Sequence, residues 1–108
     1  MKLISRNEEI ILLAIWRLEG NAYGVTIRDQ VAKVTGRQWN LGAVYVPLDT
    51  LTQKEYVRKY VGDPVAVRGG RRKTLYTLTS EGKAALQEIR EIQTVLWKGI
   101  PETAFQVR

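Results

Sequence analysis

The side chains in this sequence that could act on another molecule are mostly cations, and they gather in one short segment. Residues 54–73 hold seven lysines and arginines against two acidic residues, a net charge of +5 out of +6 for the 108-residue chain. Such a segment is either a solvated surface or a surface for a polyanion, because lysine and arginine neutralise phosphate groups. Its densest part is Arg68-Gly69-Gly70-Arg71-Arg72-Lys73.

Two missing residue types exclude much other chemistry. The chain has no histidine and no cysteine, so imidazole acid–base catalysis, thiol nucleophiles and the common zinc sites are excluded. Its eleven acidic residues form no local constellation. We therefore expect neither an enzyme nor a metal site or cofactor. Without cysteine, and without an apolar run long enough for a signal peptide or a membrane span, we expect a cytoplasmic protein with no membrane partner.

Three helices are predicted before the basic segment. Ser5 and Glu8 have the spacing of a capping box, and the apolar run that follows predicts a buried first helix that ends near Gly20. The second helix is expected from about Ala22 to Thr35. Its predicted apolar stripe consists of Tyr23, Ile27, Val31 and Val34.

The third helix follows Asn40, which is a good N-cap residue. Its stripe consists of Leu41, Val44, Tyr45, Leu48 and Leu51. Gly42 and Ala43 lie off this stripe, where short side chains let a helix backbone approach a large surface closely. Pro47 predicts a bend or a tightened turn, because proline removes one backbone hydrogen bond.

The basic segment is predicted to form a hairpin. Tyr56 to Val61 alternates with the period of a strand, and Thr74 to Leu78 is a second β-rich run. A cationic tip on two strands, placed after three helices, is a wing. The fold class is therefore mainly α with a small β-hairpin (α+β), a winged helix-turn-helix over residues 1–79.

A last amphipathic helix is expected over residues 80–98. Its apolar residues are Ala85, Leu86, Ile89, Ile92 and Leu96. So small a domain leaves no helix to cover them, and the simplest partner is the same helix of a second copy in a two-fold homodimer. Residues 99–108 are expected to be a frayed tail.

The motifs in this order resemble those of the PadR family of transcriptional regulators over nearly the whole chain. They are Tyr23-Gly24, then Gly42-Ala43-Val44-Tyr45 with Leu48 and Leu51, then Gly69-Gly70-Arg71-Arg72-Lys73 with Tyr76, Leu78-Thr79 and Glu81-Gly82. The length is similar to that of the short members, which dimerise through a single C-terminal helix. Members usually have a glycine near the turn after the third helix, where this chain has Gln53-Lys54-Glu55-Tyr56. They often have a proline one residue away from the position of Pro47.

In such a fold the third helix enters the major groove of double-stranded DNA and the wing contacts phosphates or the minor groove. The chain is thus expected to regulate transcription, as a repressor. The tyrosine in the third helix is either partly core or a phosphate contact. The expected DNA-binding residues are Lys33, Arg37, Gln38, Asn40, Gly42, Ala43, Tyr45, Val46, Arg68, Arg71, Arg72 and Lys73.

The resemblance also suggests a small aromatic effector. In some multidrug-responsive members a tryptophan late in the C-terminal helix stacks flat compounds between subunits, and Trp97 lies in a similar place. Trp97 and Trp16 are accordingly candidate effector residues, with packing in the core or the subunit interface as the alternative for both.

Two other binding functions stay open. Tyr56, Arg58 and Tyr60 interleave aromatic rings with a cation on one strand face, as platforms for RNA or single-stranded nucleic acid do. A winged helix that binds only proteins is the other alternative, although a basic wing tip is unusual for it.

Overall fold

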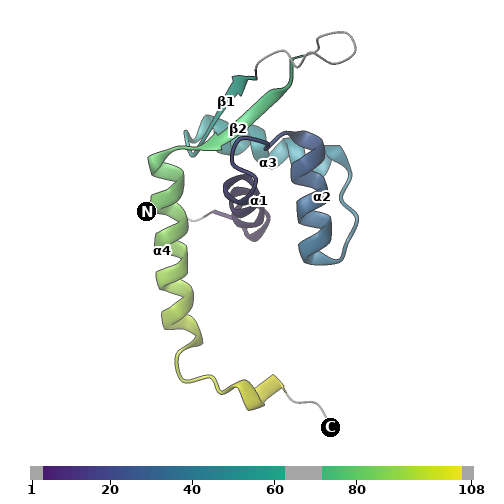
Figure 1. Ribbon diagram of the computed structural model, residues 1–108. Helices are drawn as coiled ribbons and strands as arrows, with labels where there is room; N and C mark the ends of the chain where they lie inside the picture. The colour runs from purple at the N-terminus through teal and green to yellow at the C-terminus, as the bar shows by residue number, and fades with distance from the viewer. Residues whose placement is uncertain (1–3, 63–71, 106–108) are drawn as a thin grey trace.

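The computed structural model describes residues 4–62 and 72–105, in which three helices precede a two-stranded hairpin and a fourth helix (Figure 1). This order confirms the winged helix-turn-helix with a C-terminal helix. The elements are α1 (Arg6–Arg17), α2 (Gly24–Thr35), α3 (Leu41–Gln53), β1 (Val57–Val61), β2 (Thr74–Leu78), α4 (Ser80–Trp97) and a final 3-10 turn, η1 (Glu102–Phe105).

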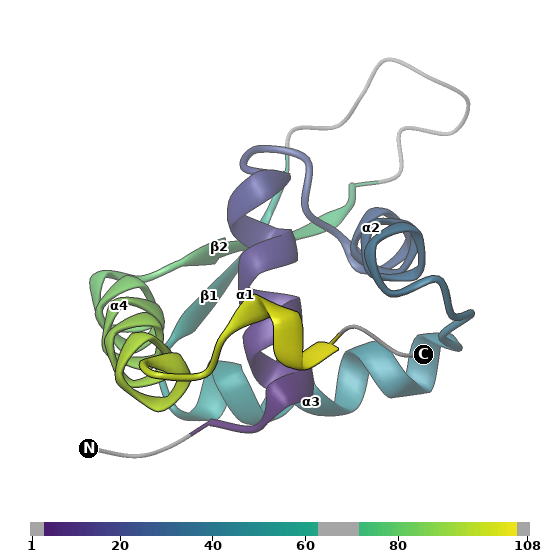
Figure 2. The same ribbon diagram turned by 90° about the horizontal axis from the view of Figure 1, so that it is seen from below.

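Helix α1 is the central element and lies between α2 and α4 in both views (Figures 1 and 2). The predicted capping box starts it: Ser5 Oγ accepts a hydrogen bond from the Glu8 backbone at 3.1 Å, and the Glu8 carboxylate accepts one from the Ser5 backbone at 2.7 Å. The core is built from three helices, which pack their fully buried side chains together. These side chains are Ile11, Leu12 and Ile15 of α1, Ile27 and Val31 of α2, and Val44, Leu48 and Leu51 of α3.

Several edges of the predicted stripes lie outside this core. Helix α2 begins at Gly24 rather than Ala22, and Val34 is 68% exposed because it lies three residues past Val31, the last buried residue of the helix. Helix α1 is buried on one side only, since Leu13 and Trp16 are exposed. Helix α3 is one continuous helix across Pro47, where buried residues on either side hold the turn in place.

The hairpin is antiparallel and pairs Val57 with Leu78 and Val61 with Thr74. Its base is attached to the helices, because Val57, Tyr76 and Leu78 are buried and the Tyr76 backbone donates to the Ala22 carbonyl at 2.8 Å. Val61 is exposed at the far end of β1, beyond the reach of the helical core.

Helix α4 is anchored at its beginning and free of the body at its end. Thr79 caps it, and Gly82 lies so close to the Tyr56 carbonyl that a Cβ atom has no room there. Ala85 and Leu86 are buried in the same chain, whereas every residue from Thr94 to Trp97 is exposed. No helix in the described residues has the length and apolar character needed to cross a membrane.

The described part of the tail, which was expected to be frayed, contains a short 3-10 turn. After α4, Gly99 takes a left-handed conformation with φ of +85° and the chain turns into η1 (Figure 2). The Phe105 ring then lies 5.6 Å from the Trp97 ring, centroid to centroid. This aromatic contact gives the short turn a reason to form.

Candidate nucleic-acid interface

The start of α3 presents a small, exposed face. The Asn40 side chain accepts a hydrogen bond from the Ala43 backbone at 2.8 Å, which confirms Asn40 as the N-cap. Gly42 and Ala43 are exposed just behind it, and Val46 is 68% exposed one turn further on. The short side chains of Gly42 and Ala43 leave this part of the helix backbone accessible.

Tyr45 is packed against α2 without being fully buried. Its phenol lies against Gly24 at the start of α2, so close that a Cβ atom on Gly24 would overlap the hydroxyl and the ring. The side chain is nevertheless 40% exposed. Tyr45 therefore fixes the approach of α3 to α2 and still offers its outer edge to solvent.

The base of the wing is tied to the start of α2. Lys73, the residue before β2, places its ammonium 4.3 Å from the centre of the Tyr23 ring and donates to the Tyr23 hydroxyl at 3.2 Å. A cation over an aromatic face is attracted by the ring's negative surface. This contact holds a cation of the wing beside the helix-turn-helix.

Burial favours the neutral form of the Tyr76 phenol. It raises the pKa of Tyr76 on β2, and nearby Tyr45 and Asp49 add to the rise because a phenolate there would face other negative groups. The neutral phenol is therefore favoured over a wider pH range than that of an ordinary tyrosine.

The remaining expected DNA-binding residues divide into two groups. Lys33, Arg37, Gln38 and Arg72 are exposed, so their side chains are accessible to a large partner. Arg68 and Arg71 lie outside the described residues. Sequence reasoning did not identify Tyr23 as a partner of the wing, because the contact with Lys73 joins residues fifty positions apart.

The turn between α3 and the wing has an unusual conformation. Glu55 has φ of +63°, a left-handed backbone that glycine adopts readily and other residues rarely do. Its carbonyl accepts the Thr79 hydroxyl at 2.7 Å, so the turn is fastened to the cap of α4. Glu55 lies within the stretch Gln53-Lys54-Glu55-Tyr56, near which members of the resembling family usually have a glycine.

The expected platform for single-stranded nucleic acid is incomplete. Arg58 and Tyr60 are exposed on β1, but Tyr56 precedes the strand and packs against the hydrophobic core. Two residues rather than three therefore share the exposed face.

Helix α4 offers a smaller free apolar surface than expected. Leu86 is 6% exposed and belongs to the core of its own chain, and Ala85 is buried as well, so neither is accessible to a second copy. Ile89 and Ile92 are half-buried and Leu96 is 66% exposed. The free apolar surface is therefore concentrated toward the end of the helix, where Val95, Trp97 and Ile100 are also exposed.

The two candidate effector tryptophans, Trp16 of α1 and Trp97 of α4, line two different hollows. Trp16 lines a groove between α1 and α4, with the Lys83 ammonium 5.4 Å from its ring centre. Trp97 lines a shallower hollow further along α4, together with Arg90 and Lys98. Arg90, Gln93 and Thr94 border both hollows.

Comparison with known proteins points in one direction. The sequence pattern of the transcriptional regulator PadR-like family matches residues 11–88. Among solved structures, the chain is similar to a PadR family transcription regulator from hypervirulent Clostridium difficile, with 27% identity, a TM-score of 0.62, and coverage of 90% of this chain and 100% of that one. No curated protein matches the chain.

Two further solved structures share the fold. A transcriptional regulator from Clostridium thermocellum is 24% identical, with a TM-score of 0.67 and coverage of 93% of this chain and 92% of that one. A PadR-like transcription factor from Bacteroides fragilis is 22% identical, with a TM-score of 0.67 and coverage of 82% and 81%.

Proposed function

Because this chain belongs to the PadR-like family of transcriptional regulators, we propose that it acts in the cytoplasm as a homodimer that binds a pseudo-palindromic site in double-stranded DNA and represses transcription. The observation that carries the proposal is the juxtaposition of a small-faced helix end with cations of the wing. Gly42 and Ala43 are exposed at the start of α3, and Lys73 is held beside the same helix-turn-helix by Tyr23.

Reading of sequence by this α3 relies on close approach. The exposed residues at its start include no arginine for a bidentate contact with guanine, and the Asn40 oxygen is used as a cap. Ala43 and Val46 suit apolar contact with thymine methyl groups, Gln38 suits a base edge, and the rest of the specificity comes from DNA shape.

Phosphate contacts orient the protein on the duplex. Lys33, Arg37 and the wing cations supply charge, and the Tyr45 hydroxyl donates to a phosphate from its exposed edge. Arg68 and Arg71, which the sequence predicts at the tip of the wing, add to this set by their charge.

The dimer forms through the end of α4. Ile89, Ile92 and Leu96 remain from the expected set, and Val95 extends their surface. Two copies related by a two-fold axis bury these residues against each other and place the two α3 helices about one turn of DNA apart, roughly 34 Å.

Selection of bound fragments from random duplexes by the purified protein tests the proposal. We expect A·T-containing, two-fold symmetric sites, and retention of binding when single-stranded DNA or RNA is added in excess. Enrichment of asymmetric fragments, or loss of duplex binding to the single-stranded competitor, would contradict the proposal and favour a single-strand binder.

A small aromatic effector is a second part of the proposal, supported by the exposed ring of Trp97 beside Arg90 and Lys98. Planar phenolic and cationic compounds are titrated into the dimer while tryptophan fluorescence is followed. Quenching that disappears in Trp97→Leu is expected. If no compound in a broad panel quenches the fluorescence, interface packing is the whole role of Trp97.

A further inference from the structure

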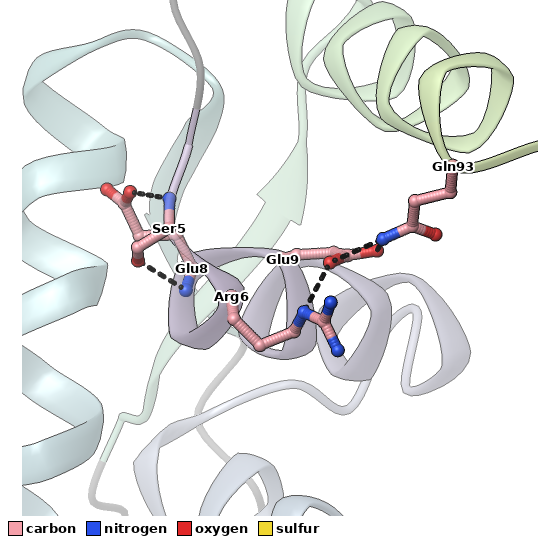
Figure 3. A network of polar contacts seen from close by, with 5 residues as sticks. All are labelled: Ser5, Arg6, Glu8, Glu9 and Gln93. Carbon is pink, nitrogen blue, oxygen red and sulfur yellow. Dashed lines mark hydrogen bonds and ion pairs between the residues drawn. The ribbon is translucent and has the colours of Figure 1, made fainter. Parts of the chain in front are cut away.

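A polar contact joins the second half of α4 to the body of the protein (Figure 3). The Gln93 amide nitrogen donates to both carboxylate oxygens of Glu9 on α1, at 3.3 and 3.2 Å. The Arg6 guanidinium lies 3.4 Å from the same carboxylate. The Glu9 side chain is only 14% exposed, so these hydrogen bonds are partly shielded from water and stronger than bonds on an open surface.

Apolar packing alone does not set the direction of α4. Its buried residues, Gly82, Ala85 and Leu86, all lie in its first two turns, and the isoleucines beyond them are only half-buried. Gln93 lies two turns further on, about 10 Å along the helix axis. Within the described residues, the Gln93–Glu9 bonds are the side-chain hydrogen bonds between α4 and α1.

The space beside this contact is a groove rather than a packed core. Leu13 and Trp16 of α1 and Lys83 of α4 line it, with Glu9 and Gln93 among its bordering residues. Since no side chains fill the groove, its width depends on what holds α4 beyond Leu86.

We propose that the Gln93–Glu9 contact, named here the α4 latch, sets the angle of α4 to the body and thereby the half-site spacing that the dimer prefers. The inference rests on the proposed function, because it requires a homodimer held through α4. When the α4 helices of the two copies are paired, the angle between α4 and the body determines where each body lies. A change in this angle therefore changes the distance between the two α3 helices.

The geometry is sensitive enough for such control. Pivoting about Leu86 by about 10° shifts the end of α4, roughly 16 Å away, by about 3 Å, which is close to the 3.4 Å rise of one base pair. A latch that removes this freedom makes the dimer discriminate between spacings that differ by one base pair.

The test uses duplexes selected by the wild-type protein, rebuilt with one or two base pairs added to or removed from the spacer. In Gln93→Glu a second carboxylate faces Glu9, which breaks the latch. We expect its discrimination between spacings to fall about tenfold, the factor associated with losing a hydrogen bond to a charged group. The affinity for a single half-site should stay within about twofold of the wild-type value, because the residues proposed to contact DNA are unchanged.

Three further variants separate the latch from a general effect on α4. Gln87→Glu makes the same change at an exposed position of the same helix and should keep the wild-type profile. Glu9→Gln with Gln93→Glu exchanges the amide and the carboxylate and should restore discrimination. Gln93→Lys pairs its ammonium with Glu9 and should also retain the discrimination between spacings. It replaces Gln93→Glu in the comparison if Gln93→Glu does not fold.

The outcomes are distinguishable. A wild-type spacing profile in a dimeric Gln93→Glu, or an equal loss in Gln87→Glu, overturns the latch while leaving the proposed function standing. Failure of the wild-type protein itself to dimerise or to bind any duplex overturns the proposed function, and the inference with it.

Discussion

Glu55 shows how a single residue carries backbone strain at the junction between α3 and the wing. Its backbone is left-handed, with φ of +63°, and both its N–H and its carbonyl are used, by Thr52 and Thr79. For a residue with a side chain this conformation costs about 1–2 kcal/mol. The hydrogen bonds on either side keep it in place.

Glu55→Gly should therefore stabilise the protein, by about 0.5–1 kcal/mol, since glycine relieves the strain but loses more entropy on folding. Urea unfolding at fixed protein concentration measures the change. Glu91→Gly on exposed α4 is the matched control and should cost about 1 kcal/mol. If the two variants are destabilised equally, Glu55 is not strained.

At this scale the sequence was informative where a residue has one dominant use. The Ser5–Glu8 box and the Asn40 cap were predicted, because each depends on neighbours within three residues. The Lys73–Tyr23 contact joins residues fifty positions apart, and nothing local in either segment indicates it.

Between elements, Glu8 ties α1 to α3. Its carboxylate caps α1 and also lies 3.2 Å from the ammonium of Lys54, the residue that ends α3. Burial raises the Glu8 pKa. The Ser5 backbone N–H and Lys54 together lower it by more than burial raises it, so that the pKa falls below its ordinary value of 4.5. The ionised form is thus favoured in the folded state.

A lowered pKa means that Glu8 stabilises the fold at any pH above about 4.5, and that this contribution is lost as the pH falls through the folded value. Glu8→Gln should be about 1 kcal/mol less stable than wild type at pH 7 and lose less stability between pH 5 and 3. Denaturant unfolding across this range is the measurement. Glu88→Gln, exposed on α4, should follow the wild-type curve; identical slopes for all three proteins would exclude the pair.

Element order and type followed from periodicity, whereas the limits of each buried face did not. Val34 and Val61 continue their patterns but extend past the core. Leu86 was expected at a subunit interface, yet a sequence pattern gives the apolar side of α4 without saying which turns face α1 of the same chain. The turn η1 was missed because the stacking of Phe105 on Trp97 follows from a reversal at Gly99.

The proposed function requires a second copy of the chain, paired through the end of α4. Leu96→Glu places a carboxylate at the proposed interface twice in each dimer. It should raise the dimer dissociation constant at least about a hundredfold, given 1.5–3 kcal/mol for each buried leucine side chain. Sedimentation over a concentration series measures this, with Glu88→Gln as control. An unchanged dimer would place the interface elsewhere.

The distribution of charge over the molecule carries the central claim, that the wing and the start of α3 together hold a duplex. The hairpin and the C-terminal end of α4 lie at opposite ends of the structure (Figure 1). Exposed cations at both ends therefore separate an effect of position from an effect of net charge.

The most direct measurement is the affinity for a selected duplex as a function of salt concentration. Each lost phosphate contact reduces the slope of log affinity against log salt by about 0.9, so Arg72→Ala with Lys73→Ala should bind more weakly with a slope shallower by up to about 1.8. Lys98→Ala, at the far end of α4, should match wild type. If the wild-type affinity does not respond to salt, or if the double variant keeps the wild-type slope, the wing does not contact phosphates of the duplex.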